Sequence, residues 1–191
     1  MDQVSVIATI PTNHNPLYGV ACVEGAEAWI CGKNKTITRI DIHGAVWDTV
    51  TTTSLDRPDG ISVTRGRELI YSDDNSDTVN IVRHGKSKTL ITTPRGWRPG
   101  SLCCTRSGDI LVQMYKENGS QTKNKIIRYQ GQNIKQEINK DGQVNPIFKD
   151  GGYLLYMSEN NNGDVCVSDR NANTVVVAVS YTHLRAHETS L

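Results

Sequence analysis

Apolar and polar residues alternate with a period of two in short segments, and turn-forming residues stand between these segments. In the clearest stretch, Ile61 and Val63 flank Ser62, which is typical of a strand with one buried face. Three further short segments follow at 68–72, 78–83 and 87–92, each separated from the next by turn formers. Four short antiparallel strands joined by tight turns make one blade of a β-propeller.

The same pattern recurs about every 41 residues. Gly19, Gly60 and Ser101 keep this spacing, and so do Ile40 and Ile81. Repetition near this length is typical of a β-propeller. We therefore predict an all-β fold: a partial, open-arc β-propeller of four-stranded antiparallel blades.

The repeat also predicts the domain boundaries. Residues 1–178 form one propeller domain, with blades at about 17–52, 58–93 and 98–139 and an incomplete blade at 151–178. Residues 4–10 are predicted to be an orphan strand, the last strand of a blade whose other strands are missing. An open arc leaves apolar surface and strand edges exposed, so we expect the chain to be a fragment.

The third blade needs about five extra residues to keep its alignment with the second. This insertion falls within 115–125, which contains Lys116, Glu117 and Gly119. Such a composition suits a longer, solvated loop between the second and third strands of that blade.

The repeat ends abruptly after Ala178. Residues 179–191 resemble a translated sequencing-library adapter, and we interpret them as a non-native tail. The spacing of His183 and His187 is therefore not taken as a metal-binding motif.

Composition excludes several classes of protein. Twenty-one basic and twenty acidic residues nearly cancel, so a strongly basic, nucleic-acid-coating surface is not evident and DNA binding is not expected. No apolar run is long enough to span a bilayer, and no signal peptide is evident. Five cysteines without a CxxC pair argue against a disulfide framework and a structural zinc site. We expect a cytoplasmic protein with no cofactor, no metal and no membrane partner.

Catalytic motifs are not evident either. Cys103 and Cys104 fall on a predicted inner strand, where free cysteine packs as a small hydrophobic residue. The acidic turn at 73–77 offers oxygen ligands suited to calcium, but such turns also close ordinary blades. No nucleophile elbow, phosphate-binding loop or acid–base pair of carboxylates stands out. We therefore expect the chain not to be an enzyme.

The candidate binding residues lie in the loops between blades and between the second and third strands of a blade. An exposed tryptophan flanked by arginines is suited to stack on a base or to anchor a protein partner. The alternative for this tryptophan is packing between blades. The six candidates are Lys33, Lys35, Arg57, Arg95, Trp97 and Arg98.

Several of these segments together resemble NHL repeats. The resemblance is strongest in Pro58-Asp59-Gly60-Ile61-Ser62-Val63 and in Ser72-Asp73 followed by Val79-Asn80-Ile81-Val82. It is closest to the propellers of tripartite-motif-like (B-box/NHL) proteins, especially the bivalve-mollusc type. Thr78 departs from the pattern, because many NHL units have arginine or histidine there.

The resemblance implies a binding module that recognises a protein partner for a tripartite-motif-like protein. An RNA-binding NHL propeller that acts in post-transcriptional regulation is the first alternative, and a propeller hydrolase or lyase with a central metal is the second. In this family the parent protein can be an E3 ubiquitin ligase that oligomerises through an upstream coiled coil. No RING, B-box or coiled-coil pattern occurs in this chain.

Overall fold

The computed structural model describes residues 6, 8–23, 25–119, 121–141, 143–152 and 154–179. These residues form strands, turns and connecting segments, with no helix among them. Accordingly, the described part of the chain has no helix long and apolar enough to cross a membrane. The predicted all-β propeller of antiparallel blades is confirmed.

Each blade is a separate antiparallel sheet in which the strands pair in sequence order. Blade 1 contains β1 (Leu17–Val23), β2 (Glu27–Gly32), β3 (Thr36–Asp41) and β4 (Val46–Thr51). Blade 2 contains β5 (Gly60–Val63), β6 (Leu69–Asp73), β7 (Thr78–Arg83) and β8 (Lys86–Thr92). Blade 3 contains β9 (Arg98–Cys104), β10 (Ile110–Asn118), β11 (Gln121–Gln130) and β12 (Asn133–Ile138). Blade 4 has three described strands, β13 (Tyr156–Glu159), β14 (Val165–Asp169) and β15 (Thr174–Ala178).

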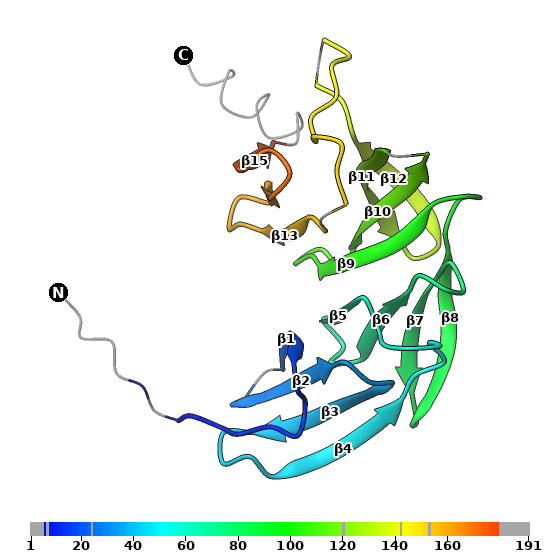
Figure 1. The fold of residues 1–191 in the computed structure, drawn as a ribbon. Helices are drawn as coiled ribbons and strands as arrows, with labels where there is room; N and C mark the ends of the chain where they lie inside the picture. Colours follow the sequence, from blue (N-terminus) through cyan, green and yellow to red (C-terminus); the bar gives the residue numbers. More distant parts are fainter. Residues whose placement is uncertain are drawn as a thin grey trace, which may run out of the picture.

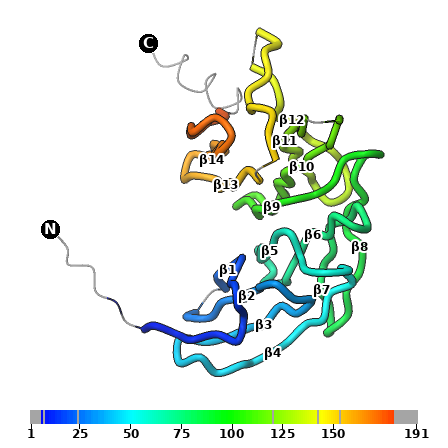
Figure 2. The backbone as a smooth tube through the Cα atoms, viewed as in Figure 1, coloured from blue at the N-terminus to red at the C-terminus, as the bar shows by residue number. Residues whose placement is uncertain are grey.

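The blades are arranged around a common centre, with the first strand of each blade innermost (Figure 1). The chain leaves the outermost strand of one blade and returns to the innermost strand of the next, as Figure 2 shows between β4 and β5. The inner strands β1, β5, β9 and β13 therefore face the centre, and β4, β8 and β12 form the rim.

Close packing of the inner strands explains the small residues that mark the repeat. A Cβ atom added to Gly60 would lie 2.7 Å from the backbone oxygen of Gly100 and 2.9 Å from Cα of Ser101. A Cβ added to Gly19 would lie 3.3 Å from Cγ1 of Ile61 in blade 2 and 2.9 Å from Sγ of Cys31 in its own blade. Contacts this short are not tolerated, so the 41-residue spacing of small residues records where neighbouring blades approach each other.

Apolar side chains fill the spaces between adjacent blades. Ile37 and Tyr71 belong to the cluster between blades 1 and 2, Ile70 and Ile127 to that between blades 2 and 3, and Leu111 to that between blades 3 and 4. All five side chains are fully buried. Each blade is hence stabilised mainly by its neighbours, as in other repeat folds.

The insertion in blade 3 is not a loop, and that expectation was wrong. Residues of β10 and β11 pair continuously from Ile110↔Tyr129 to Asn118↔Gln121. The extra residues lengthen a hairpin, in which backbone groups that a loop would expose to water are paired in the ladder. Polar composition alone did not distinguish a solvated hairpin from a solvated loop.

The acidic turn between β6 and β7 is held by its first residue. The Asp73 carboxylate is buried and accepts hydrogen bonds from the Asn75 N–H at 3.2 Å and the Ser76 hydroxyl at 2.8 Å. Asp169 accepts the N–H groups of Asn171 and Ala172 in the same way at the start of the turn before β15. These two aspartates are turn-closing residues, as the sequence suggested for this position.

The N-terminal segment packs on blade 1 without joining its sheet. His14 is buried, and its Nε2 lies 3.4 Å from Oγ1 of Thr38. Of the strand predicted over residues 4–10, the described residues Val6 and 8–10 form no strand, and the rest lies outside the described residues. All but Val179 of the tail that we interpreted as non-native is also outside the described residues.

Candidate partner-binding face

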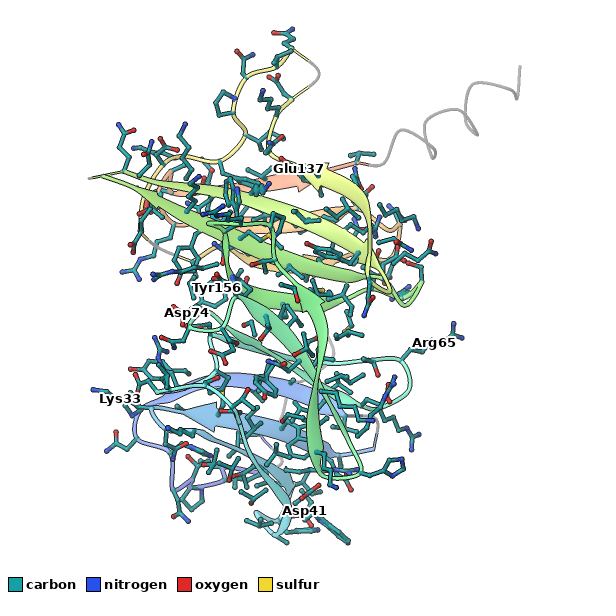
Figure 3. All side chains as sticks on the ribbon, turned by 90° about the vertical axis from the view of Figure 1, so that its right-hand side faces the viewer. Lys33, Asp41, Arg65, Asp74, Glu137 and Tyr156 are labelled. Carbon is teal, nitrogen blue, oxygen red and sulfur yellow. The ribbon has the colours of Figure 1, made fainter. Side chains whose placement is uncertain are left out.

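The alternating strand directions place two kinds of connection on opposite faces of the propeller. The loop face carries the connections between blades (52–59 and 93–97) and the turns between second and third strands (33–35 and 74–77). The turn face carries the remaining turns, including the one between β5 and β6. Figure 3 shows Lys33 and Asp74 on one side of the blades and Arg65 on the other.

The six candidate residues of the sequence analysis all belong to the loop face. Lys33, Lys35, Arg95 and Arg98 are exposed. Arg57 and Trp97 are half-buried. The structure therefore places all six on one face, but it engages the two half-buried residues in contacts within the chain.

Arg57 and Trp97 each take part in a cation–π contact. The guanidinium carbon of Arg57 lies 4.2 Å from the centroid of the Tyr18 ring, on the innermost strand of blade 1. Nζ of Lys125 lies 4.2 Å from the centroid of the Trp97 ring, which also packs against the core between blades 2 and 3. Trp97 is consequently anchored by packing, whereas Arg57 and Tyr18 form a half-exposed pair on the loop face.

Two aspartates and a tyrosine form a hydrogen-bonded group beside this pair. The backbone N–H of Asp74 donates to Oδ2 of Asp59 at 3.1 Å, and the Tyr115 hydroxyl donates to Oδ2 of Asp74 at 2.7 Å. Tyr115 is paired with Arg98 across β10 and β9, and its interaction with the guanidinium raises the pKa of Arg98. The group thus links residues of blades 2 and 3.

The negative charge of the Asp59 carboxylate is only partly balanced by positive charge nearby. Burial and the neighbouring charge of Asp74 raise its pKa to about 7, and the more distant charge of Arg57 only partly opposes this. Burial and the hydrogen bond to Asp74 likewise raise the pKa of Tyr115 above its usual range. Burial and the neighbouring acid therefore make the Asp59 carboxyl harder to ionise than an ordinary aspartate.

A cavity of about 320 Å³ opens beside Asp59, where the four inner strands converge. Tyr18 comes from β1, Ile61 from β5, Leu102 from β9 and Tyr156 from β13. Both tyrosines are exposed, at 47% and 61% of their full accessible area. The walls of the cavity combine apolar and aromatic side chains with polar groups, as the walls of ligand pockets do.

Sequence reasoning did not identify Tyr18, Asp59, Asp74, Tyr115 or Tyr156 as members of one site. The sequence did contain a signal for the two aspartates. The predicted hairpin around 64–67 pairs Gly60 with Ser72, and this pairing brings Asp59 close to Asp74. Tyr156 had no comparable signal. Its place depends on how blade 4 closes on the centre.

The cysteine pair is positioned as the sequence suggested. Cys103 and Cys104 are partly buried on β9, and burial raises the pKa of both thiols, that of Cys104 to about 11. A thiol of this kind is a poor nucleophile at neutral pH. Within the described residues, no three histidine, cysteine or acidic side chains are grouped closely enough to hold a metal ion.

Comparison with known proteins supports the fold. No family model and no curated protein matches the sequence significantly. The structure is similar to a catalytically inactive virginiamycin B lyase from Staphylococcus aureus, crystallised with quinupristin. The TM-score is 0.63 at 15% identity over 91% of this chain and 55% of the lyase. For a gluconolactonase from Xanthomonas campestris, the TM-score is 0.60 at 13% identity over 84% of this chain and 56% of that protein. A structure of the nidogen–laminin complex matches with a TM-score of 0.50 at 16% identity, over 84% of this chain and 74% of the matched one.

These similarities correct the expectation that the chain is not an enzyme. Virginiamycin B lyase and gluconolactonase are catalytic propellers. Failure to find familiar catalytic motifs in a propeller sequence is therefore not a reason to exclude catalysis. At this level of identity the likeness is one of fold. The chain spans little more than half the length of these two enzymes. It shares with them the β-propeller fold.

Proposed function

We propose that this propeller binds a protein partner through its loop face. The observation that carries the proposal is the half-exposed Tyr18–Arg57 pair beside the inner-strand cavity. Tyrosine and arginine are enriched at the energetic centres of protein interfaces, because they combine a large contact area with hydrogen-bonding groups. The nidogen–laminin match agrees with this, since that structure is a complex between two proteins.

The charges of the loop face favour a protein over an RNA partner. Arg57 and Arg98 alternate with Asp59 and Asp74, so neither sign dominates around the cavity. RNA binding depends mainly on neutralising phosphates, and carboxylates at the centre of the surface oppose it. A protein surface can supply charges of both signs in complementary positions.

The NHL-like sequence of blade 2 supports a finer assignment, the target-recognition propeller of a tripartite-motif-like protein. Asp73 is buried and closes the turn before β7, in the Ser-Asp segment that carries the resemblance. Sequencing the gene upstream of this region tests the assignment. Cysteine–histidine clusters followed by heptads are expected, and a different upstream domain would contradict it.

Peptide selection on the purified protein tests the main proposal. Peptides selected from a displayed library are measured by fluorescence anisotropy against the wild type, Arg57→Glu and Arg65→Glu. Arg65 is an exposed arginine on the turn face and serves as the matched control. We expect Arg57→Glu to weaken binding by about tenfold or more and Arg65→Glu by less than about twofold.

Two results would overturn the proposal. One is a set of selected peptides whose affinity depends on Arg65 and not on Arg57. The other is tight, salt-sensitive binding of an RNA stem-loop that is lost in Arg98→Ala, in a protein that selects no peptide.

The Asp59–Asp74 pair favours a second candidate, acid–base catalysis. A group whose pKa lies near the working pH is well suited to transfer protons, and the pKa of Asp59 is about 7. A lactone and quinupristin are suitable probes because of the similar enzymes. Product formation, followed by mass spectrometry, is expected with the wild type and not with Asp59→Asn. No product from either probe at neutral pH would count against this candidate.

A further inference from the structure

One acidic side chain stands among the described residues that line the inner-strand cavity. Among the described residues that line it, the acidic group is Asp59, and the other side chains are neutral or apolar at pH 7. We infer that this cavity binds an organic cation, namely the ammonium group of a lysine side chain that the partner inserts. The inference rests on the proposed function, because the lysine belongs to the protein bound at the loop face.

The walls of the cavity suit the methylene stem and the charge of a lysine. Ile61, Leu102 and Met157 provide apolar surface, and the rings of Tyr18 and Tyr156 lie at its edge. An ammonium near an aromatic ring gains a cation–π interaction, and a desolvated position strengthens it. A volume of about 320 Å³ accommodates one long side chain and excludes a folded segment.

The surroundings of Asp59 leave it in need of a positive charge. Arg57 stacks on Tyr18, and its charge influences Asp59 less than burial and Asp74 do. An incoming cation would stabilise the ionised form of Asp59, which burial and the charge of Asp74 disfavour. Charged groups that are buried without a partner gain most from acquiring one.

Hydrogen bonding favours an ammonium over a guanidinium. Oδ2 of Asp59 already accepts the N–H of Asp74, so a planar fork that used both carboxylate oxygens would have to share Oδ2 with this backbone group. Arginine binds carboxylates best through two parallel hydrogen bonds, whereas lysine acts as a compact point charge. An ammonium can bind through the other carboxylate oxygen without sharing Oδ2, and lysine therefore matches Asp59 better.

Binding should release a proton from the cavity. The ionisable groups that face Asp59 are Asp74 from the β6–β7 turn, Arg57 from the connection before β5, Cys31 from β2 and Tyr115 from β10. Of these, the thiol and the phenol stay neutral between pH 6 and 8, because burial raises both pKa values. The change of charge in this range thus belongs to the carboxyl pair of Asp59 and Asp74.

Isothermal titration calorimetry with a short capped lysine peptide tests the inference. The same peptide with an acetylated lysine is the matched control, since acetylation removes only the charge. We expect the lysine peptide to bind at least about tenfold more tightly than the acetylated one, and about tenfold more tightly at pH 8 than at pH 6. Titrations in two buffers of different ionisation enthalpy should show release of roughly half a proton at pH 7.

Two variants complete the test. Asp59→Asn should abolish both the preference for lysine and the pH dependence, whereas Asp48→Asn, at an exposed aspartate on β4, should change neither. Equal binding of the two peptides, or unchanged binding by Asp59→Asn, would overturn the inference. If the library peptides bind the loop face without needing a lysine, the proposed function stands and this inference fails. If the lysine peptide binds through Asp59 but no library peptide binds, the cavity is a lysine site and the proposed function fails.

Discussion

The acidic side chains on the two faces of the propeller have different partners. On the turn face, Asp109 accepts a hydrogen bond from Lys135 at 2.9 Å and lies 3.5 Å from Nε of Arg128. Arg128 also donates to Oε1 of Glu159 at 2.6 Å. On the loop face, Asp59 lies beside a second acid, and no cation among the described residues forms an ion pair with it.

This difference shows up in the protonation of the two aspartates. Burial by itself raises the pKa of Asp109, but hydrogen bonds from Lys135 and Ser107 outweigh it, so the pKa lies below the usual value. The pKa of Asp59 is raised to about 7. On the turn face, Arg128 and Lys135 pair with Asp109 and Glu159 and link blades 3 and 4. On the loop face, an acid with a raised pKa beside a cavity marks a place for a ligand.

Removing the centre of the turn-face network should have the largest effect on stability. Arg128→Ala leaves the nearly buried Glu159, with a side chain only 7% exposed, without its cation, and leaves Asp109, 2% exposed, with Lys135 as its cation partner. We expect a loss of about 3–5 kcal/mol in the free energy of unfolding, measured by urea denaturation. Arg83→Ala, at the more exposed pair with Glu68, should cost less than about 1 kcal/mol. Equal losses in the two variants would show that the turn-face network is not structural.

Neutralising one aspartate on each face should shift stability in opposite directions. An acid with a raised pKa holds extra protons in the folded state, so its ionisation destabilises the fold as pH rises from about 4 to 7. Asp59→Asn removes this cost, and after allowance for partial exposure we expect a gain of roughly 2 kcal/mol at pH 8. At pH 4 the gain should vanish.

Asp109→Asn should lower stability at pH 7 by roughly 2 kcal/mol, because a charged hydrogen-bond partner is lost. With a lowered pKa, the contribution of Asp109 is present above about pH 4 and disappears as pH falls through its folded-state pKa. Urea denaturation between pH 2 and 8 measures both variants. A gain for both, or a loss for both, at neutral pH would remove the distinction between the faces.

Tyr115→Phe should have a smaller effect, on the loop face alone. It removes the hydroxyl that donates to Asp74 at 2.7 Å and keeps the ring in place. We expect a loss of about 1 kcal/mol in the free energy of unfolding. A loss as large as that of Arg128→Ala would mean that the loop-face group is also part of the scaffold.

The exposed basic residues of the loop face should contribute least to stability. Lys33→Ala and Arg95→Ala replace side chains that are exposed and make no hydrogen bond among the described residues. We expect changes within about 0.5 kcal/mol in the same denaturation experiment. A larger loss would assign these residues a structural role that their exposure does not suggest.

The fold was predictable because the repeat reflects backbone packing. Gly19 and Gly60 are small where inner strands meet, and the alternation around Ser62 gives the strand period directly. The loop-face position of Arg57 and Arg98 followed from the alternation of strand directions. The candidate site was harder to predict from the sequence. The raised pKa of Asp59 depends on the approach of Asp74 in space, and the position of Tyr156 depends on how blade 4 is placed.

A carbon-detected NMR titration of the aspartate carboxyl groups tests the difference between the faces most directly. In the free protein, Asp59 is predicted to titrate near pH 7 and Asp109 below the usual aspartate value. Asp59→Asn and Asp109→Asn assign the two signals. If both carboxyl groups titrate near pH 4, the loop face holds no uncompensated acid, and the account of its cavity as a cation site is contradicted.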